Sequence, residues 1–257
     1  MRARKLFPFV LLALVLASSS FAEIENINNL RKRFSVISRI KSSGKERWHS
    51  KVKAEIIHHK DITFAYFEEE GEEPRGKIKR YKTWKSSAYS CLEDSKIFPY
   101  LIKMVIKNDQ GEIIEDLKKI YDRENKRVIC TVNGKVKEFE FKESLVDKQN
   151  IVVWLMTYPF EEKKDINFHL LTHAPAMHKM NMKYKGKEKL TIGSREVDCY
   201  KLEMLPDLGL LNFIRVFFPK TYFWYEVKAP HNFVRYEGLE SGLGTPYVVI
   251  EIIPQEG

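Results

Sequence analysis

The chain has 257 residues, with 44 Lys and Arg against 35 Asp and Glu, so its formal net charge is +9. The charges are interleaved along the chain and do not form Arg-rich clusters with aromatic platforms, which argues against a nucleic-acid-binding surface. A chain of this length, with 44% hydrophobic residues, can bury a large core.

The first 22 residues have the composition of a secretion signal. Arg2, Arg4 and Lys5 precede an apolar run over residues 6–17, and small residues lead up to Ala22. The apolar run is shorter than the roughly 20 residues that a membrane-spanning helix needs. The sequence therefore predicts cleavage after Ala22, a soluble periplasmic location, and a mature net charge of +6 once three basic residues are removed.

Strand signals dominate the rest of the chain. β-branched and aromatic runs bounded by turn residues predict strands at 62–67, 77–91, 100–107, 127–132, 135–141, 166–172, 179–185, 197–204, 221–227, 232–238 and 247–253. Asn133-Gly134 predicts a two-residue hairpin turn, because these residues accept the positive φ angles of a type I′ turn. Short connections predict antiparallel neighbours, since parallel strands need long crossovers. We expect one domain over residues 23–257.

Three segments have helical spacing of their apolar residues. Residues 144–156, with Asp147 as a possible cap, and residues 24–40 are predicted helices. The local pattern of residues 112–121 also favours a helix, but the family resemblance described below implies a strand there.

The three cysteines are Cys91, Cys130 and Cys199. Cys199 lies in an alternating apolar run and is interpreted as a small core residue. In an oxidising compartment Cys91 and Cys130 are the candidate disulfide pair, although the sequence does not show whether they are close in space.

The histidines and acidic residues do not form a catalytic or metal-binding pattern. His169 and His173 lie roughly 13 Å apart on a strand, and Pro175 prevents a helix from bringing His178 to them. His58 and His59 point to opposite faces of a strand. No Gly-x-Ser-x-Gly elbow or phosphate-binding loop occurs. We therefore expect no metal, no cofactor and no enzymatic activity.

Four consecutive aromatic residues are the strongest candidate for a binding site. Residues Tyr222, Phe223, Trp224 and Tyr225 place rings on both faces of a predicted strand. Both faces of such a strand must be covered, either by ordinary core packing or by a curved sheet around an apolar pocket.

The order of features in the C-terminal half resembles a known family. A short helix ends at Tyr158-Pro159-Phe160, and the segment 192–202 precedes the aromatic strand 222–225. A turn with Pro230 and the sequence Phe-Val-Arg-Tyr at 233–236 complete the pattern. This resembles an uncharacterised family of exported bacterial proteins near the periplasmic lipoprotein-carrier and outer-membrane lipoprotein-receptor (LolA/LolB-like) superfamily. The resemblance covers residues 144–253 and implies an incomplete antiparallel β-barrel, a half-open barrel with one or two closing helices. It carries over no catalytic residues.

These observations favour a non-enzymatic periplasmic protein that binds a lipid or a lipoprotein acyl chain on the concave face of its sheet. The alternative is an envelope scaffold or protein-interaction module with a solid core. Peripheral contact with an acidic membrane surface is a further use of the basic charge.

Overall fold

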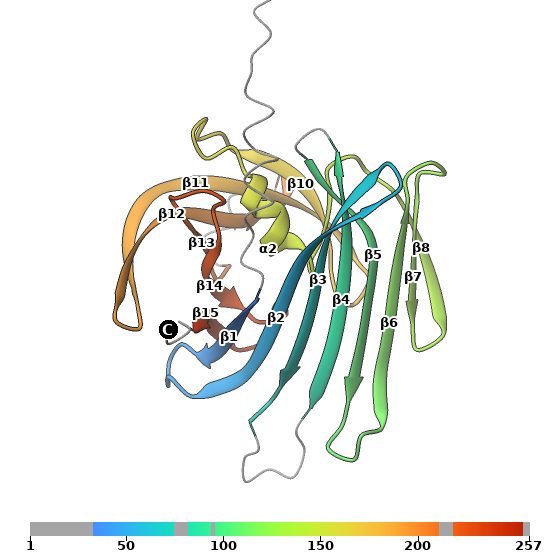
Figure 1. Ribbon diagram of the computed structural model, residues 1–257, viewed down its shortest axis with the longest axis horizontal. Helices are drawn as coiled ribbons and strands as arrows, with labels where there is room; N and C mark the ends of the chain where they lie inside the picture. The colour runs from blue at the N-terminus through green and yellow to red at the C-terminus, as the bar shows by residue number, and fades with distance from the viewer. Residues whose placement is uncertain (1–32, 75–81, 94–95, 211–217, 254–257) are drawn as a thin grey trace, which may run out of the picture.

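The computed structural model describes residues 33–74, 82–93, 96–210 and 218–253 (Figure 1). The predicted signal peptide, residues 24–32 of the first predicted helix and residues 77–81 of the predicted strand 77–91 lie outside the described residues. None of the described helices is long and apolar enough to cross a membrane.

The described residues form a mainly β fold with one large curved sheet. Its strands are β1 (Arg33–Ile40), β2 (Glu46–His59), β3 (Ile62–Glu72), β4 (Thr83–Glu93), β5 (Lys96–Lys107), β6 (Ile113–Asp122), β7 (Arg127–Val132), β8 (Lys135–Glu140), β9 (Leu145–Asp147), β10 (Ile166–Leu171), β11 (Met177–Ile192), β12 (Arg195–Pro206), β13 (Thr221–Glu226), β14 (Phe233–Leu239) and β15 (Tyr247–Ile253). The helical elements are α2 (Ile151–Trp154) and the 3₁₀ turn η1 (Leu155–Thr157).

The strand order explains how the sheet is assembled. It runs β8-β7-β6-β5-β4-β3-β2-β1-β15-β14-β13-β12-β11-β10-β9. Every neighbouring pair is antiparallel except β9 and β10, which are parallel. The pairing of β1 with β15, from Ser35 opposite Ile253 to Ile40 opposite Val248, joins the two ends of the described chain and makes the sheet continuous.

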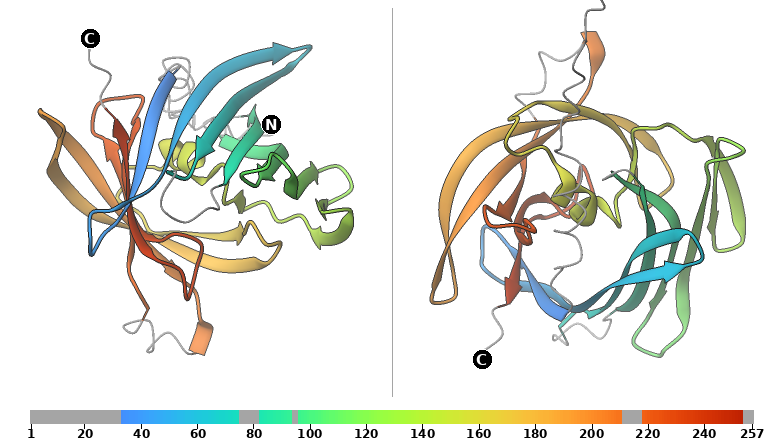
Figure 2. Two further views of the ribbon diagram at one scale, coloured as in Figure 1. Left: turned by 90° about the horizontal axis from the view of Figure 1, so that it is seen from below. Right: turned by 45° about the horizontal axis from the view of Figure 1, so that its top comes forward.

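The sheet curls but does not close into a barrel (Figure 2). Its two edge strands, β8 and β9, do not pair with each other. Instead Leu145 of β9 and Leu171 of β10 pack in one core cluster with Ile102, Leu117 and Val128 of β5, β6 and β7. The sheet therefore overlaps itself, with β9 against the concave side of β5–β7. We call the face that packs against β9 and α2 the inner face, and the opposite face the outer face.

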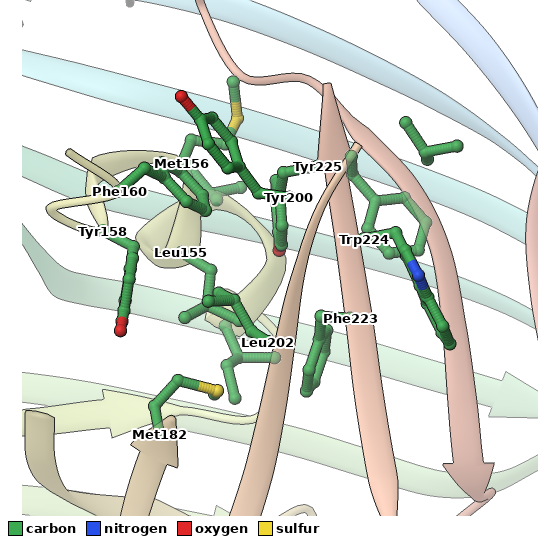
Figure 3. Packing of buried hydrophobic residues seen from close by; sticks show 14 of the residues in the cluster. Leu155, Met156, Tyr158, Phe160, Met182, Tyr200, Leu202, Phe223, Trp224 and Tyr225 are labelled. Carbon is green, nitrogen blue, oxygen red and sulfur yellow. The ribbon is translucent and has the colours of Figure 1, made fainter. Parts of the chain in front are cut away.

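The inner face of the second half of the sheet is filled by the segment that follows β9. The core residues Ile151, Leu155 and Phe160 of this segment pack with residues of β10–β14 (Figure 3). Phe160 stacks on Tyr200 of β12 with ring centroids 4.4 Å apart. In this half the concave side holds a packed core.

Most predicted strands are confirmed, including the hairpin of β7 and β8. Asn133 and Gly134 have φ angles of 48° and 76°, as a type I′ turn requires. Residues 113–122 form β6, so the strand implied by the resemblance is right and the local helical pattern is misleading. Hydrogen-bonded pairing with both β5 and β7 outweighs the local preference.

The two predicted helices need correction. Residues 33–40 form β1, which alternates buried Val36 and Ser38 with more exposed neighbours and pairs on both sides. Within 144–156 the first part is β9, and only Ile151–Trp154 is α-helical. Asp147 does not cap the helix; its side chain is engaged elsewhere, as described below, and the N-cap residue is Asn150.

Candidate functional site

The four predicted binding residues lie on β13 but on opposite faces of the sheet. Phe223 and Tyr225 lie on the inner face, where Phe223 contacts the ring of Tyr236 and the Tyr225 hydroxyl donates to Val152 O at 2.9 Å. Both side chains are buried, and burial raises the pKa of Tyr225 well above its ordinary value. In Figure 3 these rings lie with the packed core around Leu202.

Tyr222 and Trp224 lie on the outer face under basic side chains. The Lys201 ammonium lies 4.8 Å from the ring centroid of Tyr222 and 5.0 Å from that of Trp224. Trp224 Nε1 donates to Glu188 Oε1 at 2.5 Å, and only 3% of the Trp224 residue is exposed. The four residues therefore do not line one pocket, and the hollow described below is not lined by any of them.

The structure does not form the predicted disulfide between Cys91 and Cys130. All three cysteines are free and buried. Cys91 is on β4 and Cys130 on β7, so two strands separate them, a spacing of about 14 Å in a sheet. Cys130 also belongs to the inner core cluster, whereas Cys91 lies opposite Phe64 and Phe98 on the outer face. Burial raises the thiol pKa to about 11 for both residues and to about 12 for Cys199.

The structure gives His169, His173 and His178 separate partners. The His169 ring Nδ1 lies 3.0 Å from Ser144 Oγ, and burial lowers its pKa. His173 contacts Gln149 and the Glu115 carboxylate, and His178 is exposed on β11. In the part of the chain that the structure describes, no group of three or more His, Cys, Asp or Glu residues could hold a metal ion.

A buried ion pair that the sequence pattern did not reveal joins β6 to β9. Lys119 and Asp147 are both fully buried, and Lys119 Nζ donates to Asp147 Oδ2 at 2.7 Å. The ammonium also donates to Thr172 O at 2.9 Å and to Gln149 Oε1 at 3.2 Å. Three acceptors satisfy all three of its N–H groups.

The Asp147 carboxylate is equally well satisfied. Its Oδ2 also accepts from the Tyr121 hydroxyl, and its Oδ1 accepts from the Gln149 backbone N–H at 2.8 Å. Burial, together with the adjacent Asp147 charge, raises the pKa of Tyr121 well above its ordinary value. Every polar group in this cluster has a partner inside the protein. We therefore interpret the cluster as a structural ion pair that holds β9 against β6, and not as a reactive site.

An apolar stripe crosses the outer face of the first half of the sheet. Cross-strand register places its residues side by side on five consecutive strands: Tyr66, Tyr89, Leu101, Ile120 and Ile129. They face outward because the side chains next to them in sequence, such as Ala88, Ile102 and Lys119, are buried on the inner face. Ile120 is 36% exposed, although it lies in the middle of a strand.

Aromatic contacts extend the stripe along β3–β5. The Tyr66 and Tyr89 ring centroids are 4.6 Å apart, and Phe64 lies 5.1 Å from Tyr100. Tyr100 sits at the irregularity in the β4–β5 register and is 46% exposed. The sequence analysis did not predict this surface. These residues alternate with core residues, and that pattern is typical of any half-buried strand.

A lysine pair borders the apolar stripe. Lys103 of β5 and Lys118 of β6 are directly opposite each other and exposed. Like charges in directly opposite positions destabilise a sheet. Among the described residues neither ammonium forms an ion pair with a carboxylate.

The nearby acidic residues of β3 are already engaged, whereas Asp116 of β6, two residues before Lys118 on the same face, is exposed. Tyr66 donates to Glu68 Oε2 at 2.7 Å, and Lys85 donates to Glu70 Oε1 at 2.7 Å and to Glu68 Oε1 at 3.3 Å. The hydrogen bond from Tyr66, followed by the one from Lys85, lowers the pKa of Glu68. Both carboxylates have partners, which leaves the lysine pair on the β5–β6 side as a separate basic feature.

A hollow of about 770 Å³ adjoins the stripe and the lysine pair. Its lining includes Tyr66, Ser87, Lys103, Val105 and Lys107. Apolar side chains, ammonium groups and the carboxylates of Glu68, Glu70 and Glu72 therefore meet on one face, and Lys85 donates to two of these carboxylates. This arrangement can bind a molecule or surface that combines apolar groups with anionic ones.

The comparisons with known proteins bear on the fold. The sequence matches no protein-family model and has no significant match among curated proteins. A β-barrel-like protein of domain of unknown function DUF1849 from Brucella abortus has a similar structure, with a TM-score of 0.53 and 6% sequence identity. That match covers 86% of this chain and 94% of the Brucella protein.

A second solved structure is more distant. The hypothetical lipoprotein YmcC from Escherichia coli matches with a TM-score of 0.28 and 9% identity, over 93% of this chain and 91% of that one. The similarity in fold therefore rests on the Brucella structure. The comparisons therefore show a β-barrel-like fold, and the finer resemblance to lipoprotein carriers stays a prediction.

Proposed function

We propose that this chain is a non-enzymatic protein of the bacterial envelope that binds an amphipathic partner through the apolar stripe on the outer face of β3–β7. The observation that carries the proposal is the stripe itself: five apolar or aromatic residues in register on consecutive strands, with Ile120 and the adjoining Tyr100 well exposed. A contiguous exposed apolar surface on a folded protein marks an interaction site.

The inner face of the second half offers less support for a ligand pocket. Phe223 and Tyr225 are fully packed against the α2 segment, and the Tyr225 hydroxyl is already bonded to Val152 O. A ligand there would have to displace core side chains. The proposal therefore keeps the predicted hydrophobic ligand but moves its site from β13 to the outer face of the first half.

Titration with a fluorescent fatty-acyl probe tests the proposal. We expect the wild-type protein to bind the probe and the double variant Leu101→Ser/Ile120→Ser to bind it at least tenfold more weakly, because two central apolar contacts are lost. Leu243→Ser is the matched control: Leu243 is 72% exposed on the β14–β15 connection, away from the stripe, and its loss should not change probe affinity.

Thermal unfolding of each variant separates binding from folding. Both variants should keep a cooperative transition, because the replaced side chains are not in the core clusters. A flat titration of the wild-type protein, or an equal loss in Leu243→Ser, would contradict the proposal. Such a result would favour a protein-interaction module that does not bind lipid.

A further inference from the structure

The outer face of β3–β7 differs from a ligand pocket in its shape. The apolar stripe runs across five strands, a width of about 19 Å between the first and last strand. Its rings, half-buried at Tyr66 and Tyr89 and exposed at the adjoining Tyr100, lie on a sheet face and not inside an enclosed core. An extended surface of this kind fits an extended partner better than a single buried chain.

The residue types of the stripe also restrict the partner. Tyr66, Tyr89 and Tyr100 contribute rings with a polar hydroxyl at one end, and tyrosine is enriched where one side of a surface is apolar and the other is wet. Leu101 and Ile120 add aliphatic contact between the tyrosines and β7. This combination is typical of contact with the headgroup region of a lipid layer.

The charge beside the stripe selects the headgroup. Lys103 and Lys118 are adjacent to the stripe. Each lies two residues along its strand from a stripe residue, Leu101 on β5 and Ile120 on β6. The two lysines repel each other, and the acidic residues nearest to them on β3 are bound by Lys85 and Tyr66. The exposed Asp116, two residues before Lys118 on the same face, forms no ion pair with either ammonium among the described residues. An anionic group placed between the two ammonium groups would remove this repulsion. Lysine side chains are also long enough to keep the ammonium at the headgroup level while the sheet face contacts the layer.

We propose that the apolar stripe and the lysine pair dock this protein peripherally on a bilayer surface that contains anionic phospholipids. This inference rests on the proposed function, since it uses the same stripe and names its partner. The stripe supplies the apolar contact, and the lysine pair makes the contact selective for acidic headgroups. Ser87 and Thr131, the strand neighbours of Lys103 and Lys118, add hydroxyl groups beside the headgroups.

Vesicle co-sedimentation tests this inference with two lipid compositions. One set of vesicles is phosphatidylcholine alone, and the other contains phosphatidylglycerol at roughly one part in four, which gives an acidic surface. We expect wild-type protein to bind the acidic vesicles at least tenfold more tightly, and this preference to weaken as salt is raised.

Paired charge variants locate the selectivity. Lys103→Gln/Lys118→Gln should lose about 30-fold in affinity for the acidic vesicles, because each basic residue near an acidic surface contributes to binding. Lys163→Gln/Lys189→Gln is the matched control, with the same change in net charge at two exposed positions away from the stripe, Lys163 in the turn before β10 and Lys189 on β11. Its affinity should change less than threefold. Equal losses in the two variants would show general attraction and would overturn the assigned site.

The outcomes distinguish this inference from the proposed function. If the fatty-acyl probe binds and Leu101→Ser/Ile120→Ser abolishes it, but vesicles are not bound or both compositions bind equally, the membrane inference fails and the proposed function stands. If neither probe nor vesicle binds, both fail. Concentration-dependent dimers that Leu101→Ser/Ile120→Ser disrupts would assign the stripe to a second copy of the chain and would also overturn the membrane inference.

Discussion

Lys118 and Lys119 are neighbours in the sequence with opposite roles in the structure. Lys118 is exposed on the outer face, and Lys119 is fully buried against Asp147 on the inner face. Strand alternation separates them, so β6 contributes to a basic outer surface and to a buried ion pair at the same point. Burying the Lys119 ammonium is tolerable because three acceptors surround it.

The buried ion pair gives the first prediction. Asp147→Asn leaves the Lys119 ammonium buried without an anion, so we expect the free energy of unfolding to fall by about 3–5 kcal/mol. Urea denaturation measures it. Asp116→Asn, which removes an exposed carboxylate from the same strand, is the control and should change stability by less than about 0.5 kcal/mol. A loss below about 1 kcal/mol in Asp147→Asn would show that β9 is not fastened to β6 in this way.

The cysteines give a second prediction. Since all three thiols are buried and free, a thiol reagent should react slowly with the native protein and should titrate three thiols per chain after denaturation. A native chain lighter by two hydrogens, with one titratable thiol after denaturation, would contradict this and would support the predicted disulfide between Cys91 and Cys130.

Burial of these thiols also makes stability depend on pH. The folded state favours the neutral thiols, since their pKa is raised to about 11 or 12 from an ordinary value near 8.5. Their contribution to stability is complete below that ordinary pKa and is lost as the pH rises through the folded pKa. We expect urea midpoints to fall between pH 8 and pH 11, and Cys199→Ala to reduce the slope. A slope unchanged by this substitution would assign the loss to other groups, such as the buried tyrosines.

At the scale of a single element, β13 shows how one aromatic strand serves two faces. Its inner rings complete the core, and its outer rings lie beneath basic side chains of β12 and β14. The same alternation that made the strand look like a binding site divides its residues between two environments. The apolar stripe is different because its residues come from five strands and share one face.

The third prediction concerns Trp224. It is almost fully buried, so Trp224→Ala should lower the free energy of unfolding by about 3–5 kcal/mol. Fatty-acyl probe binding by the folded protein should be unchanged, since the stripe lies on other strands. Tyr222→Ala is the comparison, with a smaller loss because Tyr222 is only half-buried. Loss of probe binding in folded Trp224→Ala would return the ligand site to β13.

At the scale of the molecule, the long-range pairing of β1 with β15 and the overlap of β9 with β5–β7 define the curved shape. The first leaves the sheet continuous, and the second lets it curl without closing. The exposed edge strand β8 carries Lys135, Lys137 and Glu138, and charged side chains at an edge oppose pairing with another sheet.

The export signal gives the fourth prediction. We expect the mature chain to begin at Glu23 and to be released with the periplasmic fraction, with a minor portion sedimenting with membranes because of the proposed lipid contact. N-terminal sequencing and cell fractionation measure this. A chain that keeps Met1 and sediments entirely with the membrane would contradict cleavage and would indicate an anchored protein.

The sequence by itself determined the elements that depend on local chemistry. The hairpin at Asn133-Gly134 follows from two residues that accept positive φ angles, and β10 to β15 follow from aromatic and β-branched runs between turns. The incomplete-barrel expectation came from the family resemblance that these features carry. It is consistent with the curved sheet that the structure shows.

Only the tertiary structure decided which face each residue occupies and which distant strands meet. The apolar residues in 33–40 and 113–122 have helical spacing, but both segments form strands because each hydrogen-bonds to two neighbouring strands. No local sequence pattern encodes these neighbours. The ion pair of Lys119 with Asp147 and the apolar stripe depend on cross-strand register. Register is set by the whole sheet, and a shift of one residue would exchange the inner and outer faces of every strand involved.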